Sequence, residues 1–345
     1  MKCAPIVITT LNRVDHLARL LDSLKGNHLS CDTDVDVGLD YPPSDIYKDG
    51  YKQVCSYLEG DFTSFKSFTV VKRIDNFGYL NNVDDLVSQI LKVHDRFIYM
   101  DDDLELSPNF LEYMNSCLDQ YEEREDVVAV CGYSYPLAWR TGHEATVFEE
   151  SFICPMWGTG FWRNKYVQIA QYIKEGGLAR DAHSTIKQGG FARLSDIGRR
   201  EFVDLCLSPD FSVTLAAKVT DISLRLYIAA NNKYAIMPVI SKVRNWGFDG
   251  TGEFCRNVEV SEARISSMNY SYSSQPIDVS PSFLLVSDTC NAIKTNKKLM
   301  NGFDLLSLID RIKVWLKITL FVIVGLSVYH KITTAFRRLK YTYGK

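Results

Sequence analysis

The first 120 residues alternate between short runs of apolar, β-branched residues and amphipathic segments, and this alternation limits the possible folds more than any other feature. The run at 4–10 has the composition of a buried parallel strand, and the runs at 35–39, 68–72 and 96–100 are further predicted strands. Segments with helical spacing of leucine and valine, such as 82–93, separate several of them. This order predicts an α/β fold with a mostly parallel sheet and helices on both faces.

Three consecutive aspartates, Asp101, Asp102 and Asp103, stand at the end of the fourth run, ahead of a helix predicted to begin at Ser107 and Pro108. Adjacent carboxylates repel one another, so the arrangement is unfavourable unless a cation lies nearby. Carboxylate oxygens suit a hard divalent cation, here Mn²⁺ or Mg²⁺. The alternative is a solvated acidic turn whose charge complements the dipole of the following helix.

Polar residues also follow the other predicted strands. Arg13 follows the first strand, which Thr10 ends; Asp40 follows the second; Asn76 and Gly78 follow the third. Ligands of parallel sheets bind beyond the carboxyl ends of the strands. We therefore predict that these residues and the three aspartates form one site.

The remainder of the chain is less regular. The cluster WGTGFW at 157–162 has two interpretations: a core turn packed by its tryptophans, or a sugar site where glycines admit the ligand and aromatic faces stack on it. Residues 268–302 are rich in Ser, Asn and Lys, which is typical of a linker. We therefore predict an α/β domain at 1–267, a linker at 268–302 and a C-terminal segment at 303–345.

The C-terminal segment combines an apolar stripe with basic residues, and this pattern predicts an amphipathic helix on a membrane surface. A short tilted span is one alternative, although the uninterrupted apolar run at 318–329 is shorter than the ~17 residues usually needed. A helix packed on the rest of the protein or on a partner subunit is the other.

Charge and cysteine content exclude several functions. The net charge of -3 and the absence of a basic excess in the first 300 residues argue against nucleic-acid binding. Nine scattered cysteines without a C-x-x-C pair indicate reduced thiols, and the N-terminus leads directly into a strand, so we expect a cytoplasmic location. The six histidines show no ligand spacing and are assigned no chemistry.

Three stretches, covering roughly residues 4–255, resemble nucleotide-sugar glycosyltransferases with the GT-A fold. PIVITTLNRVDHLARLLDSL is similar to the first strand and helix of bacterial glycosyltransferase family two. MDDDLELSPNFLEYM resembles the D-x-D region, especially in the N-acetylglucosaminyltransferases of the N-glycan pathway. DISLRLYIAANNKYAIMPVISKVRNWGFDGTG resembles the acceptor-side segment of the same enzymes.

The resemblance implies a role for each matching residue. Asp40 would hydrogen-bond the base, and Arg13 would lie near the base or the phosphates. Asp101 and Asp102 would contact the ribose and sugar of the donor, and Asp103 would hold the metal. Trp157, Gly158 and Gly160 would line the donor-sugar pocket, with Thr10, Asn76 and Gly78 also on the donor side. Asp221 matches the catalytic base, with Asp196 and Asp210 as competing candidates.

The implied activity is metal-dependent, inverting transfer of a hexosyl or N-acetylhexosaminyl group from a nucleoside diphosphate donor, expected to be a UDP-sugar, to a glycan. A lipid-linked acceptor at the cytoplasmic face of the inner membrane, in surface polysaccharide biosynthesis, would fit the C-terminal segment. One alternative is a sugar-phosphate nucleotidyltransferase, which would need a glycine-rich signature where this chain has TTLNRVDH. Another is an inactive glycan-binding scaffold, which the intact aspartate triplet disfavours.

Overall fold

The computed structural model describes residues 2–135, 139, 145–150, 154–194, 196–207, 218–252, 277–281, 283–288 and 307–343. The chain divides into two compact units. The first comprises Met1–Glu150, Pro155–Tyr166 and Tyr234–Asn296, and the second Ser151–Cys154, Val167–Lys233 and Lys297–Lys345. The predicted boundaries at residues 267 and 302 both lie outside the described residues.

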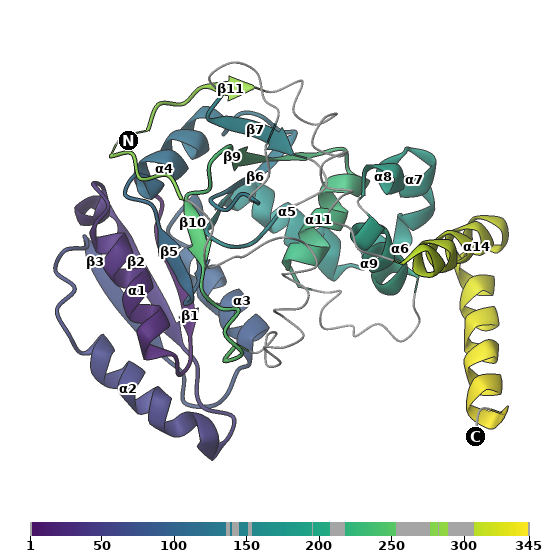
Figure 1. The fold of residues 1–345 in the computed structure, drawn as a ribbon, viewed down its shortest axis with the longest axis horizontal. Helices are drawn as coiled ribbons and strands as arrows, with labels where there is room; N and C mark the ends of the chain where they lie inside the picture. The colour runs from purple at the N-terminus through teal and green to yellow at the C-terminus, as the bar shows by residue number, and fades with distance from the viewer. Residues whose placement is uncertain are drawn as a thin grey trace. The chain divides into compact units, whose positions relative to one another are not determined.

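The first unit is built on a sheet to which the described residues contribute nine strands, in the order β11-β7-β9-β6-β8-β4-β1-β2-β3 (Figure 1). The strands are β1 Ile6–Thr10, β2 Asp34–Leu39, β3 Ser67–Lys72, β4 Arg96–Asp101, β6 Val127–Cys131, β7 Val147–Glu150, β8 Thr159–Trp162, β9 Tyr234–Pro238 and β11 Ser287–Asp288. A separate antiparallel pair is formed by β5, Leu104–Leu106, and β10, Val243–Asn245.

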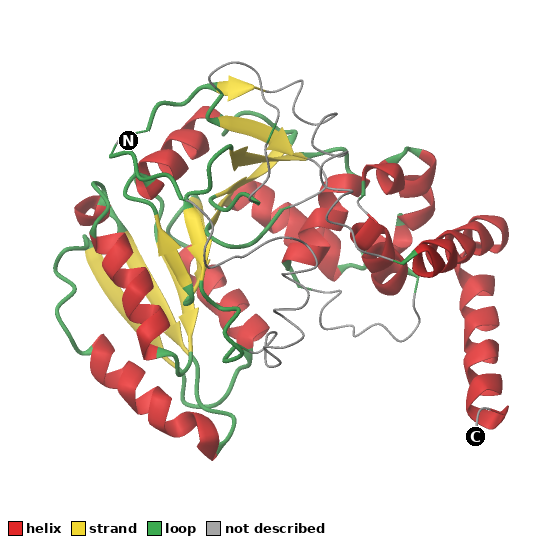
Figure 2. Ribbon diagram, in the orientation of Figure 1, coloured by secondary structure: helices red, strands yellow, loops and turns green. Residues whose placement is uncertain are grey.

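The direction of the strands places the polar residues at one edge. β1 pairs in parallel with both β2 and β4, and β2 pairs in parallel with β3. β8 lies antiparallel between β4 and β6, while β6 and β9 are again parallel. The predicted α/β class, with a mostly parallel sheet flanked by helices, is confirmed (Figure 2).

Apolar faces hold the helices of the first unit in place. These helices are α1 Val14–Lys25, α2 Lys48–Leu58, α3 Tyr79–Ile90 and α4 Phe110–Gln120, with short 3₁₀ turns at Ser30–Asp32 and Asp45–Tyr47. In α1 the buried residues are Leu17, Leu20, Leu21 and Leu24, as the helical spacing predicts. The predicted start of α4 is corrected: the helix begins at Phe110 with Asn109 in the cap position, and the Ser107 hydroxyl donates to the Asn109 side chain.

Part of the predicted linker packs on the first unit. Asp278 forms an ion pair with the buried Lys242, and Phe283 meets Tyr113 edge to face, with 5.1 Å between ring centroids. Beyond them β11 extends the sheet by pairing with β7. Residues 277–281 and 283–288 are therefore not a free linker; the paired carboxylate of Asp278 and the ring of Phe283 anchor them, which a polar composition does not predict.

The second unit is helical in the part that the structure describes. Its helices are α6 Gly177–Arg180, α7 Ala182–Lys187, α8 Gly190–Arg193, α9 Asp196–Cys206, α11 Asp221–Ala230 and α14 Leu308–Tyr343. α5, Arg163–Lys174, begins in the first unit and continues into the second.

The C-terminal helix α14 packs one face on the second unit. Val314, Ile318 and Phe321 are buried, and the Arg311 guanidinium lies 2.9 Å from the Asp196 carboxylate. The backbone leaves helical geometry at Gly325, where φ is 73°, and the helix changes direction there (Figure 1). By length and composition alone, Leu308–Phe336 is long and apolar enough to cross a membrane.

The carboxyl group of Asp36 in β2 is expected to make the stability of the protein depend on pH. Burial, with a contribution from Asp34, raises the pKa of Asp36 in β2 from 3.8 to about 6. Between these values Asp36 is ionised in the unfolded chain but still protonated in the folded protein. The free energy of unfolding therefore falls as pH rises, and this loss is complete above about pH 6. Asp36→Asn is therefore expected to raise the free energy of unfolding at pH 7.5 by about 1 kcal/mol after allowance for solvent screening, and to change it little at pH 3.5.

Urea unfolding at the two pH values measures this effect. Asp34→Asn is the matched control on the same strand. Burial acts to raise the pKa of Asp34, but hydrogen bonds from Lys66 and Ser67 outweigh it and lower the pKa. Asp34→Asn should therefore destabilise the protein at pH 7.5, and equal effects of the two variants would contradict the assignment.

Candidate functional site

The aspartate triplet lies at the carboxyl end of β4, next to the carboxyl end of β1. Arg13, which follows β1, donates from one guanidinium nitrogen, Nη2, to Asp102 and to Asp103, the latter at 2.9 Å. The Thr10 hydroxyl donates to the other oxygen of Asp102 at 2.7 Å. The repulsion between the aspartates is thus partly offset within the protein, by a guanidinium and a hydroxyl from the neighbouring strand.

Asp101 has a different environment. It accepts hydrogen bonds from the hydroxyls of Tyr99 and Tyr79. Burial raises its pKa to about 7, the charges of Asp103 and Asp102 act in the same direction, and the tyrosine hydroxyls oppose them. Near neutral pH this carboxyl is therefore close to its midpoint, and a further cation beside it would favour the ionised form.

Arg13 and Asp103 are electrostatically linked. Burial acts to lower the pKa of Arg13, but Asp102 and Asp103 outweigh it and hold the pKa above its ordinary value. Burial raises the pKa of Asp103, and Arg13 opposes that shift. Two buried polar atoms, Asp103 Oδ1 and Arg13 Nη1, have no hydrogen-bond partner among the described residues.

Residues 243–252, which we call the strap, lie against the triplet. β10 pairs with β5, and the Trp246 amide donates to the Asp103 carbonyl at 2.8 Å. The Trp246 indole donates to Glu105 at 2.8 Å, and the Arg19 guanidinium stacks over its ring at 4.5 Å. The strap thereby fixes the backbone on the C-terminal side of the three aspartates.

Gly247 of the strap has no side chain, and this leaves room for the Asp103 carboxylate. A Cβ at this position would collide with the carboxyl group of Asp103 and lie 3.2 Å from the Asn245 side chain. Gly247 is buried and Arg13 holds the Asp103 carboxylate, so neither can move easily to relieve the collision. Gly247→Ala is therefore expected to destabilise the protein by about 1–3 kcal/mol and to displace Asp103. Urea unfolding measures the first effect.

Gly252→Ala is the matched control for this prediction. A Cβ at Gly252 would meet the Arg13 guanidinium at 3.4 Å, an ordinary contact. We expect a change within about 0.5 kcal/mol. Equal stabilities of the two variants would show that Gly247 does not restrict Asp103.

Asp40, Asn76 and Gly78 meet in a second polar cluster, at the ends of β2 and β3. One Asp40 oxygen accepts the backbone amides of Tyr41 and Phe77, both at 2.8 Å, and the other accepts the Asn76 side chain at 3.3 Å. Gly78 has a positive φ of 71° and caps α3. The structure therefore brings these three residues together, and Asp40, which was predicted to hydrogen-bond the base, holds the backbone of this loop.

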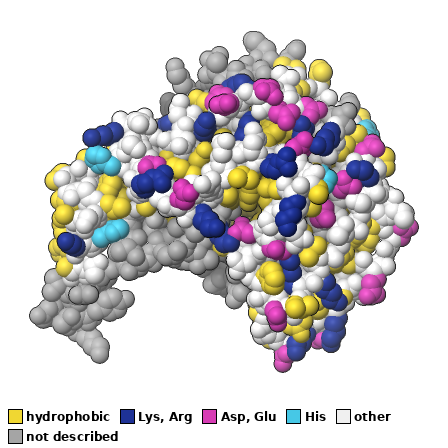
Figure 3. Space-filling view, turned by 180° about the vertical axis from the view of Figure 1, so that it is seen from behind, with side chains coloured by type: hydrophobic (Ala, Val, Ile, Leu, Met, Phe, Trp, Pro, Cys, Tyr) yellow, Lys and Arg dark blue, Asp and Glu magenta, His cyan; other side chains and the backbone are white. Residues whose placement is uncertain are grey.

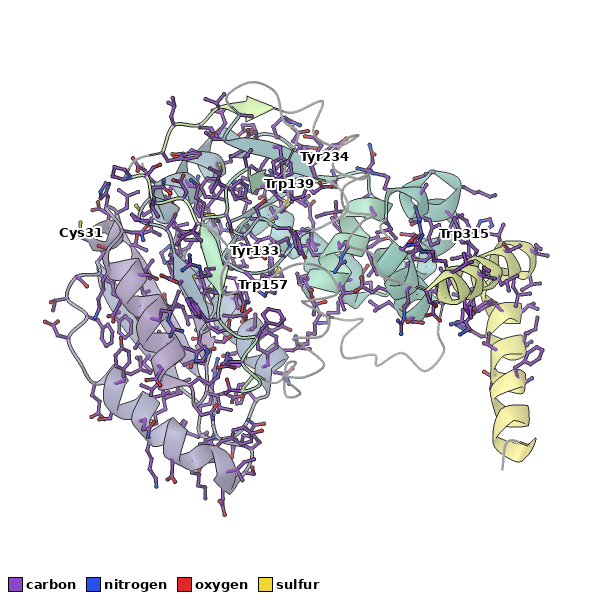
Figure 4. All side chains as sticks on the ribbon, in the orientation of Figure 1. Cys31, Tyr133, Trp139, Trp157, Tyr234 and Trp315 are labelled. Atoms are coloured by element: carbon purple, nitrogen blue, oxygen red, sulfur yellow. The ribbon has the colours of Figure 1, made fainter. Side chains whose placement is uncertain are left out.

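The WGTGFW segment divides between packing and exposure. Gly160 in β8 lies under α4, where a Cβ would meet Met114 at 2.9 Å, and Gly158 has a positive φ of 67°. Packing accounts for Gly160 without a ligand. Trp157 is partly exposed and meets Tyr133 edge to face, with 4.6 Å between ring centroids (Figure 4). Of the three predicted pocket residues, Trp157 supplies an aromatic ring, which also meets Phe248 of the strap with 5.9 Å between ring centroids.

The three candidate bases differ in their surroundings. Asp221 opens α11 after a Thr220–Ser223 capping box, and its side chain is 55% exposed, with the Arg225 guanidinium at 3.9 Å. Asp196 is 14% exposed and forms ion pairs with Arg199 and Arg311. Asp210 lies outside the described residues. Asp221 and Asp196 belong to the second unit, whereas the aspartate triplet and the strap belong to the first.

The donor set of the triplet fits a hard divalent cation. Asp103 Oδ1 is a buried carboxylate oxygen without a hydrogen-bond partner in the described part of the chain, and the other two aspartates of the triplet carry further carboxylate oxygens. Within that same part, no group of three or more His, Cys, Asp or Glu side chains is already arranged as a metal cage. Arg13 instead holds the oxygens of Asp102 and Asp103 that face it.

Several residues of this site were not predicted from the sequence. Tyr79, Tyr99, Glu105 and Gly247 contact the triplet or the strap, but hydroxyls and a lone glycine carry no pattern of their own. The available signal was the segment NWGFDG at 245–250, which was identified only as an acceptor-side match.

The sequence matches no family model and no curated protein. Among solved structures, TarS 1-349 of S. aureus shares 13% identity at a TM-score of 0.39, over 69% of this chain and 58% of that chain. The same fragment in complex with UDP shares 16% sequence identity at a TM-score of 0.31, over 43% of this chain and 40% of that chain. The mannosyltransferase PcManGT from Pyrobaculum calidifontis, in complex with GDP-Man and Mn²⁺, shares 10% sequence identity at a TM-score of 0.37. The match covers 98% of this chain and 80% of that chain. The chain spans 58% and 40% of these two TarS 1-349 chains, and 20% of the chain in another TarS structure.

Proposed function

We propose that the protein is a metal-dependent, inverting glycosyltransferase that moves a sugar from a nucleoside diphosphate, a UDP-sugar by preference, to a glycan. The observation that carries the proposal is the aspartate triplet at the carboxyl end of β4, beside Thr10 and Arg13 of the neighbouring strand end. Ligands bind at this edge of parallel sheets, and clustered carboxylates recruit the cation that a diphosphate needs.

Each residue has a distinct role in the proposed reaction. Asp103 holds Mn²⁺ or Mg²⁺, which when bound neutralises charge on the departing diphosphate. Asp101 and Asp102 contact the ribose and sugar, and Trp157 offers an aromatic face to the ring. Asp221 accepts the proton of the acceptor hydroxyl as that oxygen bonds to the anomeric carbon and the bond to the diphosphate oxygen breaks.

A screen of nucleotide sugars tests this function. The full chain is incubated with each donor, and release of nucleoside diphosphate is measured with Mn²⁺, with Mg²⁺ and with EDTA. We expect release from one class of donor that EDTA abolishes. Full activity in EDTA would refute the metal site, formation of nucleotide sugar from a nucleoside triphosphate and a sugar phosphate would favour a nucleotidyltransferase, and glycan binding without release would favour a scaffold.

We further propose that α14 attaches the enzyme to the cytoplasmic face of the inner membrane, where a lipid-linked acceptor of surface polysaccharide synthesis would lie. Opposite its packed face, α14 exposes Leu308, Ile309, Ile312, Leu316 and Ile323. Hydrophobic side chains are visible on this outer surface at the left edge of Figure 3. Lys313 and Lys317 flank the stripe and suit anionic headgroups, so we favour a helix lying in the interface over one crossing it.

The combined change Ile312→Glu and Leu316→Glu tests this attachment. Because it removes two apolar anchors, binding to vesicles containing phosphatidylglycerol should fall by about tenfold or more in a sedimentation assay. Truncation after residue 300 is less suitable, since it would also remove the buried Ile318 and Phe321.

Ile46→Glu combined with Val93→Glu makes the matched control, because both residues are exposed and apolar in the first unit. This control should bind vesicles like the unaltered protein. Unchanged vesicle binding of the α14 variant would refute membrane attachment, and dissociation of an oligomer in its place would indicate that a second copy covers the stripe.

A further inference from the structure

The Arg13 guanidinium holds carboxylate oxygens of Asp102 and Asp103 next to the one that is left for a cation. Its Nη2 bridges Asp102 Oδ1 and Asp103 Oδ2, and the side chains of Arg13 and Asp102 are 16% and 6% exposed. Asp102 uses its second oxygen to accept from Thr10. Of the four oxygens of Asp102 and Asp103, only Asp103 Oδ1 has no hydrogen-bond partner among the described residues.

One guanidinium does not balance this site. Arg13 contributes one positive charge against three neighbouring carboxyl groups, and its own Nη1 is buried without a hydrogen-bond partner in the described part of the chain. Two unsatisfied buried groups of opposite sign, on residues already in contact, indicate that neither has its best partner. A cation at Asp103 would satisfy the first, and an anion near Arg13 would satisfy the second.

Local geometry lets the side chain move without its backbone. Arg13 is the N-cap residue of α1, and its side chain makes no capping hydrogen bond. Its carbonyl accepts the Leu17 amide at 3.1 Å, which fixes the main chain. Release of the guanidinium therefore requires only side-chain rotation.

We propose that Arg13 is an internal counter-ion that exchanges with the divalent cation. Without metal its guanidinium holds Asp102 and Asp103 together. Metal binding at Asp103 Oδ1 displaces it, because a divalent ion on one oxygen of this carboxylate and a guanidinium on the other are close enough to repel each other, and the released guanidinium then binds the donor diphosphate. The inference rests on the proposed function for the metal at Asp103 and adds that metal and arginine compete.

Binding of Mn²⁺ to the full chain tests the competition directly. Free Mn²⁺ is followed by electron paramagnetic resonance for the unaltered protein, Arg13→Gln, Arg19→Gln and Asp103→Asn, without nucleotide. We expect Arg13→Gln to bind Mn²⁺ about tenfold more tightly or better, because its competitor is gone. Arg19→Gln removes the same charge from α1 but leaves the triplet contacts intact, and should change the affinity by less than about threefold. Asp103→Asn should abolish binding.

A second readout uses stability and nucleotide. Without metal, Arg13→Gln should unfold at a lower temperature, because two buried carboxylates lose their partner, and Mn²⁺ should raise its unfolding temperature more than that of the unaltered protein. With Mn²⁺ present, the same variant should bind UDP more weakly. Opposite changes in Mn²⁺ and UDP affinity are not expected of a residue that only supports the fold.

Arg13→Lys covers the case in which Arg13→Gln does not fold. Lysine keeps the charge but loses the planar fork, so its Mn²⁺ affinity should lie between those of the unaltered protein and a chain lacking the competitor. If the unaltered protein binds Mn²⁺ and both Arg13 variants bind it equally or more weakly, exchange is refuted while the metal site stands. If no variant binds Mn²⁺ with or without UDP, the proposed metal site fails, and exchange fails with it.

Discussion

Asp103→Ala is expected to lower sugar transfer by about 10³-fold or more and to abolish its dependence on divalent metal. The ion would lose the carboxylate that attaches it to the protein, and charge stabilisation of several kcal/mol on the leaving diphosphate would be lost with it. The fold should persist, because Arg13 keeps Asp102 as a partner and removal of the carboxylate leaves space beside Gly247. Transfer rates at saturating donor, across a titration of Mn²⁺, measure the effect.

Asp45→Ala is the control for this change. Asp45 lies in the same unit with a side chain that is 90% exposed, so its loss removes a carboxylate without touching the triplet. Transfer by this variant should stay within about twofold of the unaltered protein. If Asp103→Ala still responds to Mn²⁺ as the unaltered protein does, the metal is held elsewhere.

Asp221→Asn should lower the transfer rate by about 10²-fold or more while leaving UDP binding nearly unchanged, because a positioned base is lost and the donor contacts are not. Stability should change little, since the Thr220–Ser223 capping box that starts α11 is retained and the substituted side chain is largely exposed. Single-turnover transfer separates this chemistry from binding, which calorimetry with UDP measures.

Asp196→Asn is the comparison for the base assignment. Its carboxylate is committed to Arg199 and Arg311, so we expect loss of stability, seen as a lower unfolding temperature, in place of lost chemistry. An active Asp221→Asn protein would transfer the base role to Asp196 or Asp210.

The regular elements of the sheet could be predicted because each carries its own periodic signal. The β-branched runs became β1 to β4, and the leucines of α1 are buried on one face, as their spacing predicts. Helix caps were less predictable: α4 was expected to begin at Ser107 and Pro108, and it begins at Phe110 with Asn109 in the cap position.

The site was predictable as a set of strand ends and not as a set of contacts. β5 and β10 have three residues each, too few for a periodic pattern, so the strap and its glycine were missed. The pairing of Arg13 with the aspartates depends on β1 and β4 being neighbours, which hydrophobic periodicity does not encode. Gly160 matched a sugar-pocket motif, although its neighbours in α4 explain it by packing.

The order in which the chain leaves and re-enters the first unit has a consequence for its synthesis. In the chain, β9 and β11 of the sheet follow helices α6 to α11 of the second unit. About 290 residues must therefore leave the ribosome before every strand of the sheet is available. Until then β7 has neither of its two neighbours and β6 is paired only with β8, so their unpaired edges are open to aggregation. Nascent chains arrested before Tyr234 should therefore depend on chaperones, whereas chains that extend past Asp288 should not.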